Sequence, residues 1–499
     1  MLTAYTADQI RAAEHALMAR LPEGTLMQRA ATALAVVTAR TLGRVYGSRV
    51  ALLIGGGDNG GDALYAGARL ARRGARVEAV LAGSRAHEGG LAALRAAGGR
   101  VAAGGERGGL PGGVADVVAA ADVIVDGLVG IGGGGALREP YAGLANLAND
   151  ADGTVVAVDV PSGVDASTGC VAGAAVRADV TVTFGARKIG LLVDPGASLA
   201  GRLEVIDIGL GPYLPEPDVV ALTAADVAGR LPRPEAESDK YRRGVVGVVA
   251  GSDRYTGAAV LAVGGAVRGG AGMVRFASAP TPVQLVRARW PEAVTTVIEP
   301  GEDPRAAIER VGRVQAWVLG PGMGTDERAH ALARAVLGTG LPTVLDADGL
   351  TLLAADRSLL RPDLLLTPHA GELSRLLGVP RERIEANRLE HVRRAAGELG
   401  VTVLLKGSTT LVAETGRPVR VNTTGTPWLA TGGTGDVLSG LAGALLAGGL
   451  SCLDAGSCAA FLHGLAARVL PARPISAQDL PDALPEARRA LDSPAKMEG

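Results

Sequence analysis

The sequence predicts two α/β domains, the first of them built on a parallel β-sheet whose two faces are covered by helices. Nearly continuous apolar runs, each ending in glycine or polar residues, alternate with helical stretches along most of the 499 residues. Strands with this pattern are buried on both faces. A proline-rich, charged segment at 211–243 interrupts the pattern and is typical of a linker leading into a new domain. We therefore expect one domain over 1–214 and another over 222–499.

The first domain is expected to begin with two helices. Thr6 and Gln9 have the spacing of a capping box, which opens a helix. A second, alanine-rich helix is expected around 27–42. The run RVALLI at 49–54 then reads as the first strand of the sheet.

A glycine-rich turn, GGGDNGGD at 55–62, follows this strand and leads into a further helix. Strand, glycine-rich turn and helix are the layout of a nucleotide-binding βα unit. Asp58, Asn59 and Asp62 lie inside the turn, where their oxygens can hold a cation or accept hydrogen bonds from ribose hydroxyls. A capped surface turn is the alternative interpretation.

The remaining strands of the first domain also end in polar residues. Apolar runs occur at 77–83, 123–135, 154–165 and 180–192, whereas 84–113 has no clear pattern. Ligands bind at the carboxyl ends of the strands in sheets of this kind. Five polar residues fall at or just after such ends and are expected to converge on one site: Asp62, Asp126, Asp159, Ser162 and Lys188.

The second domain repeats the pattern of apolar strand and polar loop. Strand-like runs occur at 245–252, 316–324, 343–350, 364–372 and 401–412, and the residues at 255–259 open a helix.

The stretch NTTGTPWLATGGTGDVLSGL at 422–441 organises this domain. It leads from a short β-rich run into an apolar helix through Gly432, Gly433 and Gly435. A glycine-rich helix start favours an anion, so Asp436 is interpreted as an acid or base working beside a phosphate. A glycine-rich turn with Asp436 as its N-cap is the alternative.

Two other loops of the second domain contain candidate binding or catalytic side chains. Lys406 and the hydroxyls of the KGSTT segment follow a strand and suit a phosphate or adenosine. His369 lies at the same sheet edge and is interpreted as functional rather than structural. Three roles remain for Asp346 and Asp348: orienting a sugar, holding a metal through water, or capping the next helix.

Charge and composition argue against several classes of function. The formal net charge is −1 and aromatic residues are 3% of the chain, so we expect neither nucleic acid nor an anionic membrane as partner. The longest apolar run, 437–450, is too short to span a bilayer. Three cysteines without metal-like spacing suit a reducing cytoplasm. The first residues include Asp8, Arg11 and Glu14, so no signal peptide is expected.

The motifs, taken in order, resemble a known family, the fused NAD(P)H-hydrate repair enzymes. GGGDNGGD, DGLVGIG, DVPSGVD and TFGARKIGLL are similar to the NAD(P)HX epimerase domain. AGSDRYTGA, GPGMG, DADGL, TPHAGE, KGSTT and the 422–441 stretch are similar to the ADP-dependent NAD(P)HX dehydratase. The resemblance implies a Rossmann-like parallel-sheet domain followed by a ribokinase-like α/β domain.

The resemblance also implies a function and its ligands. The first domain would interconvert the R and S hydrates of NADH and NADPH. The second would dehydrate the S form while ADP is converted to AMP and phosphate. K⁺ is expected in the epimerase site and Mg²⁺ with the nucleotide. Alanine- and glycine-rich helices suit close packing between subunits, so a homo-oligomer is expected.

Site residues are carried over on the matching positions. The epimerase substrate would contact Asp58, Asn59, Gly60, Gly61, Asp62, Gly130, Ile131, Gly132, Gly133, Gly134, Gly135, Ala136 and Asp159. K⁺ would be held by Asn59, Asp126 and Ser162. The dehydratase substrate would contact Ala258, Gly322, Gly324, His369 and Asp436. The adenine nucleotide would contact Lys406, Gly407, Ser408, Thr409, Thr410 and Gly435.

Three residues are the expected catalysts. Asp436 would take the proton from the C6 hydroxyl in the dehydratase, while Asp159 and Lys188 are the acid–base candidates of the epimerase. The family pattern has asparagine where this chain has Asp58, and Gly-Met where it has Trp428 and Leu429.

Two other function classes remain as alternatives. One is a small-molecule kinase of the ribokinase class, which would form a stable phosphorylated product but leaves the first half of the chain unexplained. The other is a non-catalytic nucleotide-binding protein, which would not need an acid facing a phosphate.

Overall fold

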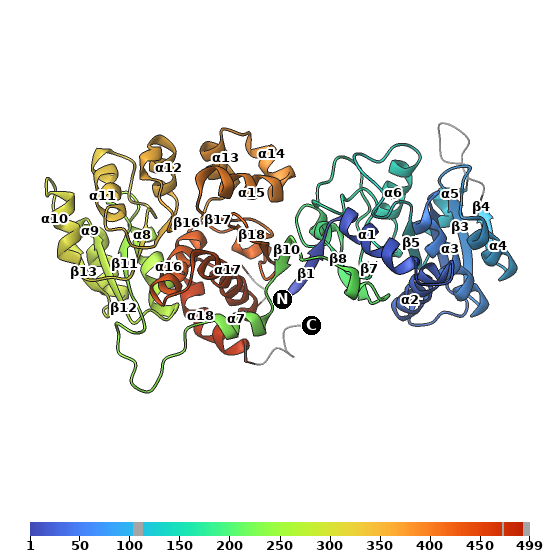
Figure 1. Ribbon diagram of the computed structural model, residues 1–499, viewed down its shortest axis with the longest axis horizontal. Coiled ribbons are helices and arrows are strands. Elements are labelled where there is room, and N and C mark those ends of the chain that lie inside the picture. Colours follow the sequence, from blue (N-terminus) through green and yellow to red (C-terminus); the bar gives the residue numbers. More distant parts are fainter. Residues whose placement is uncertain (103–112, 472–473, 493–499) are drawn as a thin grey trace. The chain divides into compact units, whose positions relative to one another are not determined.

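The computed structural model describes residues 1–102, 113–471 and 474–492. The chain forms two compact units. The N-terminal unit comprises Thr3–Val219, and the C-terminal unit comprises Val220–Gly499 together with Met1–Leu2. Each unit has its own sheet and helical layers (Figure 1).

The sheet of the N-terminal unit is parallel, as predicted. Within the described residues its order is β4-β3-β2-β5-β6-β7-β9. Its strands are β2 (Arg49–Ile54), β3 (Arg76–Leu81), β4 (Arg100–Ala102), β5 (Val123–Gly127), β6 (Thr154–Val158), β7 (Val180–Phe184) and β9 (Arg202–Ile206). Its helices are α1 (Ala7–Met18), α2 (Thr25–Leu42), α3 (Asp58–Arg72), α4 (Glu88–Ala96), α5 (Val114–Ala119) and α6 (Tyr141–Asp150). Short 3-10 turns are η1 (Ile189–Leu191), η2 (Gly196–Leu199) and η3 (Gly211–Tyr213).

Both faces of this sheet are buried, which explains the continuous apolar runs. In β2, Leu52 and Ile54 pack with α1 to α4 on one face. Ala51 and Leu53 pack with α5 and α6 on the other face. The predicted strand at 49–54 and the capping box of Thr6 and Gln9 are both confirmed.

The unpatterned stretch at 84–113 contains structure that the sequence did not indicate. The structure places α4 and β4 there, while 103–112 lie outside the described residues. The predicted run at 180–192 also divides. β7 ends at Phe184, and β8 (Arg187–Lys188) leaves that sheet to pair in parallel with β1 (Leu2–Tyr5), with Tyr5 opposite Lys188.

In the C-terminal unit, the strands from β11 to β19 neighbour one another in the order β13-β12-β11-β14-β15-β16-β17-β18-β19. These strands are β11 (Val245–Val249), β12 (Met273–Ser278), β13 (Val294–Val297), β14 (Ala316–Leu319), β15 (Thr343–Leu345), β16 (Leu364–Leu366), β17 (Thr402–Leu405), β18 (Thr410–Ala413) and β19 (Val419–Asn422). The pairs from β13 to β17 are parallel, whereas β17, β18 and β19 are antiparallel. The sheet of this unit is therefore mixed, with an antiparallel end.

Helices cover both faces of this sheet. Figure 1 shows α11, α12 and α13 on one side and α16, α17 and α18 on the other. The helices are α7 (Ala224–Arg230), α8 (Thr256–Arg268), α9 (Pro280–Arg289), α10 (Pro304–Val311), α11 (Glu327–Leu337), α12 (Asp348–Ala355), α13 (Ala370–Leu377), α14 (Arg381–Ala386), α15 (Arg388–Leu399), α16 (Thr434–Ala447), α17 (Cys452–Val469) and α18 (Asp479–Ala490). Two 3-10 turns are η4 (Arg357–Leu359) and η5 (Pro427–Leu429).

Helix α16 is held at short range against α8. A Cβ atom at Gly440 would lie 1.9 Å from Ala262 O, and one at Gly265 would lie 2.1 Å from Val437 O. Only glycine permits such an approach of backbone to backbone. Gly440 on α16 and Gly265 on α8 therefore allow the two helices to pack backbone against backbone, which fixes the position of α16.

The predicted linker at 211–243 is partly regular structure. It contains η3, the short strand β10 (Val219–Ala221) and α7, so only its later, proline-rich part lacks helix and strand. The two compact units divide within this segment, between Val219 and Val220, and Thr223 then opens α7 with a capping box to Asp226.

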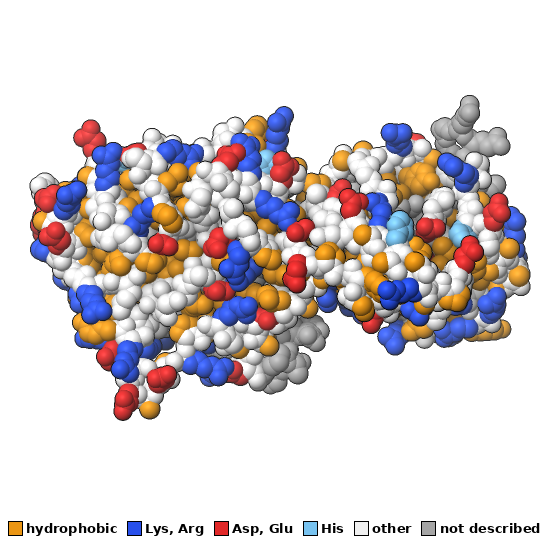
Figure 2. Space-filling model, in the orientation of Figure 1, with side chains coloured by type: hydrophobic (Ala, Val, Ile, Leu, Met, Phe, Trp, Pro, Cys, Tyr) orange, Lys and Arg blue, Asp and Glu red, His pale blue; other side chains and the backbone are white. Residues whose placement is uncertain are grey.

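The molecular surface carries charges of both signs. In Figure 2, Lys and Arg side chains are interspersed with Asp and Glu over the visible face. Among the described helices, no segment has both the length and the apolar character needed to cross a bilayer.

Candidate functional site

The Asp58–Asp62 segment lies at the carboxyl end of β2, where the sequence predicted a site. The structure corrects its conformation, because these residues form the start of α3 rather than a turn. Gly57 is the N-cap and makes no side-chain cap. A Cβ atom at Gly60 would lie 2.3 Å from Gly55 O, so glycine is required there. The oxygens of Asp58, Asn59 and Asp62 are thus carried on a rigid helix start.

Asp126 and Ser162 form a buried oxygen cluster beside Asn59, as predicted. Asp126 Oδ1 accepts a 2.6 Å hydrogen bond from Ser162 Oγ, and Oδ2 accepts one of 2.8 Å from Ser162 N. Asn59 Nδ2 donates to Val158 O at 3.0 Å. A Cβ atom at Gly130 would lie 2.7 Å from Asn59 Oδ1, so the amide oxygen packs directly against this glycine. Burial raises the pKa of Asp126 to about 6, against the opposing hydrogen bonds from Ser162.

Asp159 and Lys188 form a buried ion pair at the ends of β6 and β8. Asp159 has a left-handed backbone (φ 68°), a conformation that non-glycine residues seldom adopt outside functional sites. Lys188 is fully buried and donates to Asp159 Oδ1, to Thr183 Oγ1 at 3.0 Å and to Phe184 O at 2.8 Å. All three ammonium protons are therefore used within the protein. This arrangement suits a residue that positions Asp159 better than one that exchanges protons with a substrate.

Asp62 provides a further unsatisfied group in the same place. Its Oδ1 is buried and has no hydrogen-bond partner among the described residues. Burial, followed by the charges of Asp159, Asp58 and Glu14, raises the pKa of Asp62 well above its usual range. A buried acceptor without a partner is costly unless a ligand supplies the donor.

The glycine-rich segment from Gly130 to Ala136 is an irregular loop that follows β5. It is tied down from α1, because Arg11 Nη2 donates to Ile131 O at 2.8 Å. Most of its remaining residues are exposed, which leaves their backbone amides accessible to a ligand. Sequence reasoning did not identify Arg11 as part of this arrangement.

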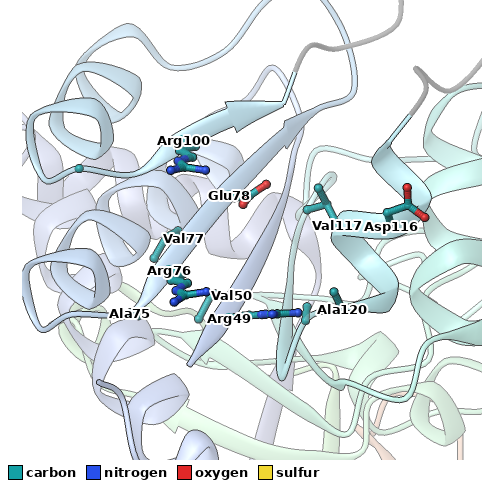
Figure 3. A pocket seen from close by; sticks show the side chains of 12 residues that line it. Arg49, Val50, Ala75, Arg76, Val77, Glu78, Arg100, Asp116, Val117 and Ala120 are labelled. Carbon is teal, nitrogen blue, oxygen red and sulfur yellow. The ribbon is translucent and has the colours of Figure 1, made fainter. Parts of the chain in front are cut away.

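The N-terminal unit also contains a cavity of about 700 Å³. It lies elsewhere, at the amino ends of β2, β3 and β4, where Arg49, Arg76 and Arg100 begin their strands (Figure 3). None of the predicted site residues lines it. Its position at the opposite edge of the sheet separates it from the chemistry-bearing carboxylates.

In the C-terminal unit, the N-terminus of α16 presents Asp436 as expected. The cap residue is Gly433, in a left-handed conformation with no side-chain cap. The interpretation of Asp436 as an N-cap is therefore excluded. Burial raises the pKa of Asp436 to about 7, and the charge of Asp346 adds to this shift while Lys406 opposes it. An acid with this pKa can both accept and release a proton near neutral pH.

Lys406 lies between several of these acids. Its Nζ is 2.7 Å from Asp346 Oδ1 and 3.8 Å from Glu372 Oε2. A Cβ atom at Gly435 would be 3.3 Å from the same Nζ, so the two predicted nucleotide residues do converge. Burial lowers the pKa of Lys406, but the charges of Asp346 and Glu372 outweigh it and raise the pKa overall. Lys406 is therefore a fixed cation beside Asp436.

Asp346 is the residue that joins these elements, and its role was left open by the sequence. Besides Lys406, its Oδ2 accepts a 2.6 Å hydrogen bond from Ser439 Oγ on α16. Asp346 is only 1% exposed. The sugar-contact and helix-cap interpretations do not fit a carboxylate that is committed to a lysine and a serine.

The segment from Lys406 to Thr410 is a tight connection between antiparallel strands rather than a loop between strand and helix. Arg388 on α15 supports it from below, donating to Lys406 O at 2.8 Å and to Thr409 O at 3.4 Å. A Cβ atom at Gly407 would be 2.2 Å from Arg388 Nη2. Arg388 was not predicted, because its contribution depends on tertiary packing and not on a motif.

The remaining dehydratase residues are brought together in part. A Cβ atom at Gly322 would lie 2.9 Å from Ala258 Cβ, so these two are in contact. Gly324 N donates to Asp348 Oδ2 at 2.9 Å. His369 has a structural use, because its Nδ1 accepts from the backbone N–H groups of Gly371 and Glu372 at the start of α13.

Two residues near α16 add to the description of this end of the unit. His463 is buried and its Nε2 lies 2.9 Å from Thr434 O, which can only accept a hydrogen bond. Burial lowers the pKa of His463 to about 4, so the ring donates as a neutral group. Trp428, where this chain departs from the family pattern, lies in η5 and is 44% exposed.

Two protein families match the chain. The family described as "NAD(P)H-hydrate dehydratase" matches residues 246–488. The family described as "YjeF-related protein N-terminus" matches residues 23–190. Each match falls within one of the two compact units.

Curated relatives resemble the chain over most of its length. The "Bifunctional NAD(P)H-hydrate repair enzyme Nnr" of Mycobacterium leprae (strain TN) is 46% identical over 479 residues, which cover 94% of each chain. The protein of the same name from Mycobacterium tuberculosis (strain ATCC 25618 / H37Rv) is 47% identical over 456 residues, or 89% of each chain.

A solved structure is also similar. It is a ribokinase-like superfamily protein from Enterococcus faecalis V583, with 25% identity and a TM-score of 0.50. The similarity covers 55% of this chain and 96% of that protein. The likeness agrees with the ribokinase-like fold predicted for the second domain.

Proposed function

The chain belongs to the family of bifunctional NAD(P)H-hydrate repair enzymes, and we propose that it repairs hydrated nicotinamide cofactors in two steps. The N-terminal unit interconverts the R and S forms of NAD(P)HX. The C-terminal unit dehydrates the S form to NAD(P)H, with conversion of ADP to AMP and phosphate. The observation that carries the second step is Asp436, an acid with a pKa near 7, held beside Lys406 at the N-terminus of α16.

In the dehydratase, Asp436 accepts the proton of the C6 hydroxyl. The hydroxyl oxygen attacks the β-phosphorus of ADP, and the bond from that phosphorus to the oxygen of AMP breaks. The amide groups at Gly433–Gly435 and the ammonium of Lys406 stabilise the charge on the transferred phosphoryl group. The C6–O bond then breaks as phosphate leaves, driven by the ring nitrogen, and loss of a C5 proton restores the dihydronicotinamide.

A divalent cation is proposed to enter this site with the nucleotide, since the described residues include no group of three or more His, Cys, Asp or Glu placed to hold a metal ion by themselves. Asp346, Asp348 and Glu372 all contribute to the raised pKa of Asp436, so the site holds four carboxylates against the single ammonium of Lys406. Mg²⁺ bound with the nucleotide phosphates would neutralise charge on the transferred group. Lys406 to Thr410 and Gly435 are proposed to hold the nucleotide, and Ala258, Gly322, Gly324 and His369 the hydrate.

In the epimerase, we assign substrate contacts to Asp58–Asp62, to Gly130–Ala136 and to Asp159. The oxygens of Asn59, Asp126 and Ser162 are proposed to hold K⁺, because amide, carboxylate and hydroxyl oxygens are hard ligands. Bound K⁺ would fix the loop that contacts the substrate. Lys188 orients Asp159, which is the acid–base group facing the hydrate.

The proposal is tested with an equilibrated mixture of R and S NADHX, ADP and Mg²⁺, by following the return of NADH absorbance. Complete recovery, faster than spontaneous epimerisation allows, is expected. Recovery that stops after a fast phase would contradict the epimerase assignment. No recovery with either ADP or ATP would contradict the dehydratase assignment and favour a kinase.

The pH dependence of dehydration is expected to follow Asp436. Because its pKa is raised to about 7, Asp436 is protonated below that pH and cannot act as a base. We expect kcat/KM for S-NADHX to fall as pH decreases below about 7. In Asp346→Asn the acidic limb should move to lower pH, since the charge of Asp346 raises the pKa of Asp436. An unmoved limb would contradict this assignment.

Arg388→Ala is expected to weaken ADP binding. Loss of the guanidinium removes charged hydrogen bonds to Lys406 O and Thr409 O, which hold the nucleotide segment in place. Such bonds contribute about 1.5–3 kcal/mol, so the Kd for ADP should rise by about 10- to 100-fold. Arg394→Ala is the matched control, because Arg394 lies on the same helix and pairs only with exposed Glu398 among the described residues. Equal Kd values for both variants would refute the role of Arg388.

The proposed enzyme is a homo-oligomer of the cytoplasm. The support for this part is the odd number of cysteines and the alanine- and glycine-rich helices. Light scattering of the purified chain measures the assembly state directly.

A further inference from the structure

Helix α1 is anchored over the epimerase site at three points. The strand that precedes it pairs with β8, so that Tyr5 lies opposite Lys188. Its first residue, Ala7, donates its backbone N–H to Ser167 Oγ at 2.9 Å. One turn later, Arg11 donates to Ile131 O in the substrate loop. The helix therefore forms one wall of the site rather than a distant cover.

Glu14 lies on the same face of this wall as Arg11, because residues three apart are neighbours on a helix. It is half-buried and stands beside the buried stripe formed by Ile10, Ala13 and Leu17. Within the described part of the chain, its carboxyl makes no hydrogen bond or ion pair. The Glu14 carboxyl is thus neither fully exposed to solvent nor used in a structural hydrogen bond or ion pair among the described residues.

The charged groups that face Glu14 come from several elements. Burial raises the pKa of Glu14 to about 7, and the charge of Asp159 and then that of Asp58 act in the same direction. Lys188 and Arg11 oppose the shift. Asp62 also interacts with Glu14 electrostatically. Near neutral pH, Glu14 therefore exists in both its protonated and its ionised form.

Asp62 gives an independent indication that a ligand occupies this space. Its Oδ1 is buried and lacks a donor among the described residues. The ligand is therefore expected to bring a hydrogen-bonding group to this place, a donor to the ionised carboxylate or an acceptor for the protonated carboxyl. A hydroxyl and an amide of a hydrated nicotinamide both meet that requirement.

Epimerisation at C6 requires more than one acid–base group. The hydrate is a hemiaminal, so its C6–N1 bond can open and close again on the other face. Opening needs a base for the proton of the C6 hydroxyl and an acid that protonates N1. Lys188 already donates to Asp159, Thr183 and Phe184, so another group is needed that points a free proton at N1.

We propose that Glu14 is the second acid–base residue of the epimerase and works opposite Asp159 on the nicotinamide ring. The inference rests on the proposed epimerase function. Asp159, as its ion-paired carboxylate, accepts the hydroxyl proton while C6–N1 breaks and C6 becomes an aldehyde. The electron pair of the broken bond goes to N1, which takes a proton from Glu14. Rotation about C5–C6 and the reverse transfers close the ring with inverted configuration and restore both groups.

The test uses the full chain and purified R-NADHX without ADP, with the formation of S-NADHX followed by chromatography. Glu14→Gln is expected to lower the enzymatic rate by about 10²- to 10⁴-fold, the usual contribution of such a group. Its ADP-dependent dehydration of S-NADHX should remain within twofold of the parent. Asp152→Asn is the control, because it removes an exposed carboxylate just before β6, at the opposite end of that strand from Asp159.

The pH profile and a conservative variant separate catalysis from packing. The parent rate should fall as pH rises through about 7, because Glu14 must be protonated to act as the acid. Glu14→Asp should retain this alkaline limb and part of the rate, whereas the residual rate of Glu14→Gln should lack it. A Glu14→Gln rate within threefold of the parent would overturn the inference. Equal losses in both variants with unchanged limbs would also overturn it.

Failure of the proposed function gives a different result. In that case the parent chain would not convert R-NADHX faster than buffer alone.

Discussion

Asp436→Asn is expected to lower the rate of ADP-dependent dehydration by about 10²- to 10⁴-fold, the usual contribution of a general base. The amide fills the same space at the N-terminus of α16 but cannot accept the hydroxyl proton. ADP should bind as well as before or more tightly, because the substitution removes a negative charge near the phosphates. The effect is therefore expected in kcat, measured with saturating S-NADHX, rather than in the affinity for ADP.

Asp303→Asn serves as the control for this variant. Asp303 caps α10 through its side chain, and asparagine caps a helix equally well. Its dehydratase rate should match that of the parent. Near-parental turnover of Asp436→Asn would refute the assigned role, whereas a loss confined to ADP affinity would make Asp436 a binding residue only.

Lys188→Met is expected to destabilise the N-terminal unit by about 3–5 kcal/mol, the usual cost of leaving one partner of a buried ion pair unpaired. Lys188 is fully buried, and Asp159 is only 7% exposed. Methionine fills most of the volume but supplies no proton to Asp159, Thr183 or Phe184. The free energy of unfolding, followed by denaturant titration with a probe in the N-terminal unit, measures the effect, and epimerisation should be lost at the same time.

The double variant Lys188→Met with Asp159→Asn tests whether charge is the cause. It removes both charges and should regain much of the lost stability without regaining epimerase activity. Arg202→Met is the control, because its ion pair with Glu204 is exposed and such pairs contribute about 0–1 kcal/mol. A Lys188→Met loss no greater than that of the control would contradict the importance of the buried pair.

The sequence was sufficient for the strands whose faces are both buried. The run at 49–54 became β2 without change, because a strand in the middle of a parallel sheet leaves an uninterrupted apolar signal. β4 gave no such signal, since its three residues at the sheet edge are exposed or half-buried. The apolar run at 401–412 predicts one strand followed by a loop, but it folds into β17 and most of β18, which are antiparallel. Apolar character alone does not specify the direction of the neighbouring strand.

The candidate sites were predictable where a side chain follows its strand in sequence. Asp126 and Ser162 converge because Asp126 lies near the end of β5 and Ser162 follows β6, which are neighbouring parallel strands. Lys188 reaches Asp159 from β8, which lies outside that sheet, and Gly435 reaches Lys406 from the first turn of α16. Arg388 acts through contacts with residues far away in sequence, and no local pattern marks it. Asp346 stands in the DADGL motif, but the motif does not reveal its contacts with Lys406 and Ser439. His369 shows the reverse case, in which a residue singled out by its position also serves as a helix cap.

The neutral state of His463 has a consequence for how the dehydratase responds to acidity. The neutral ring donates a hydrogen bond to Thr434 O. Because its pKa is about 4, His463 gains no proton near pH 7, where Asp436 is protonated. Acidification through pH 7 therefore changes the charge at the start of α16 while the backbone that presents it keeps its support. A histidine with an ordinary pKa would make the loop and the base titrate together. Here His463 does not titrate near pH 7, so the pH dependence of the dehydration rate in that range reports the ionisation of Asp436 without a change at His463.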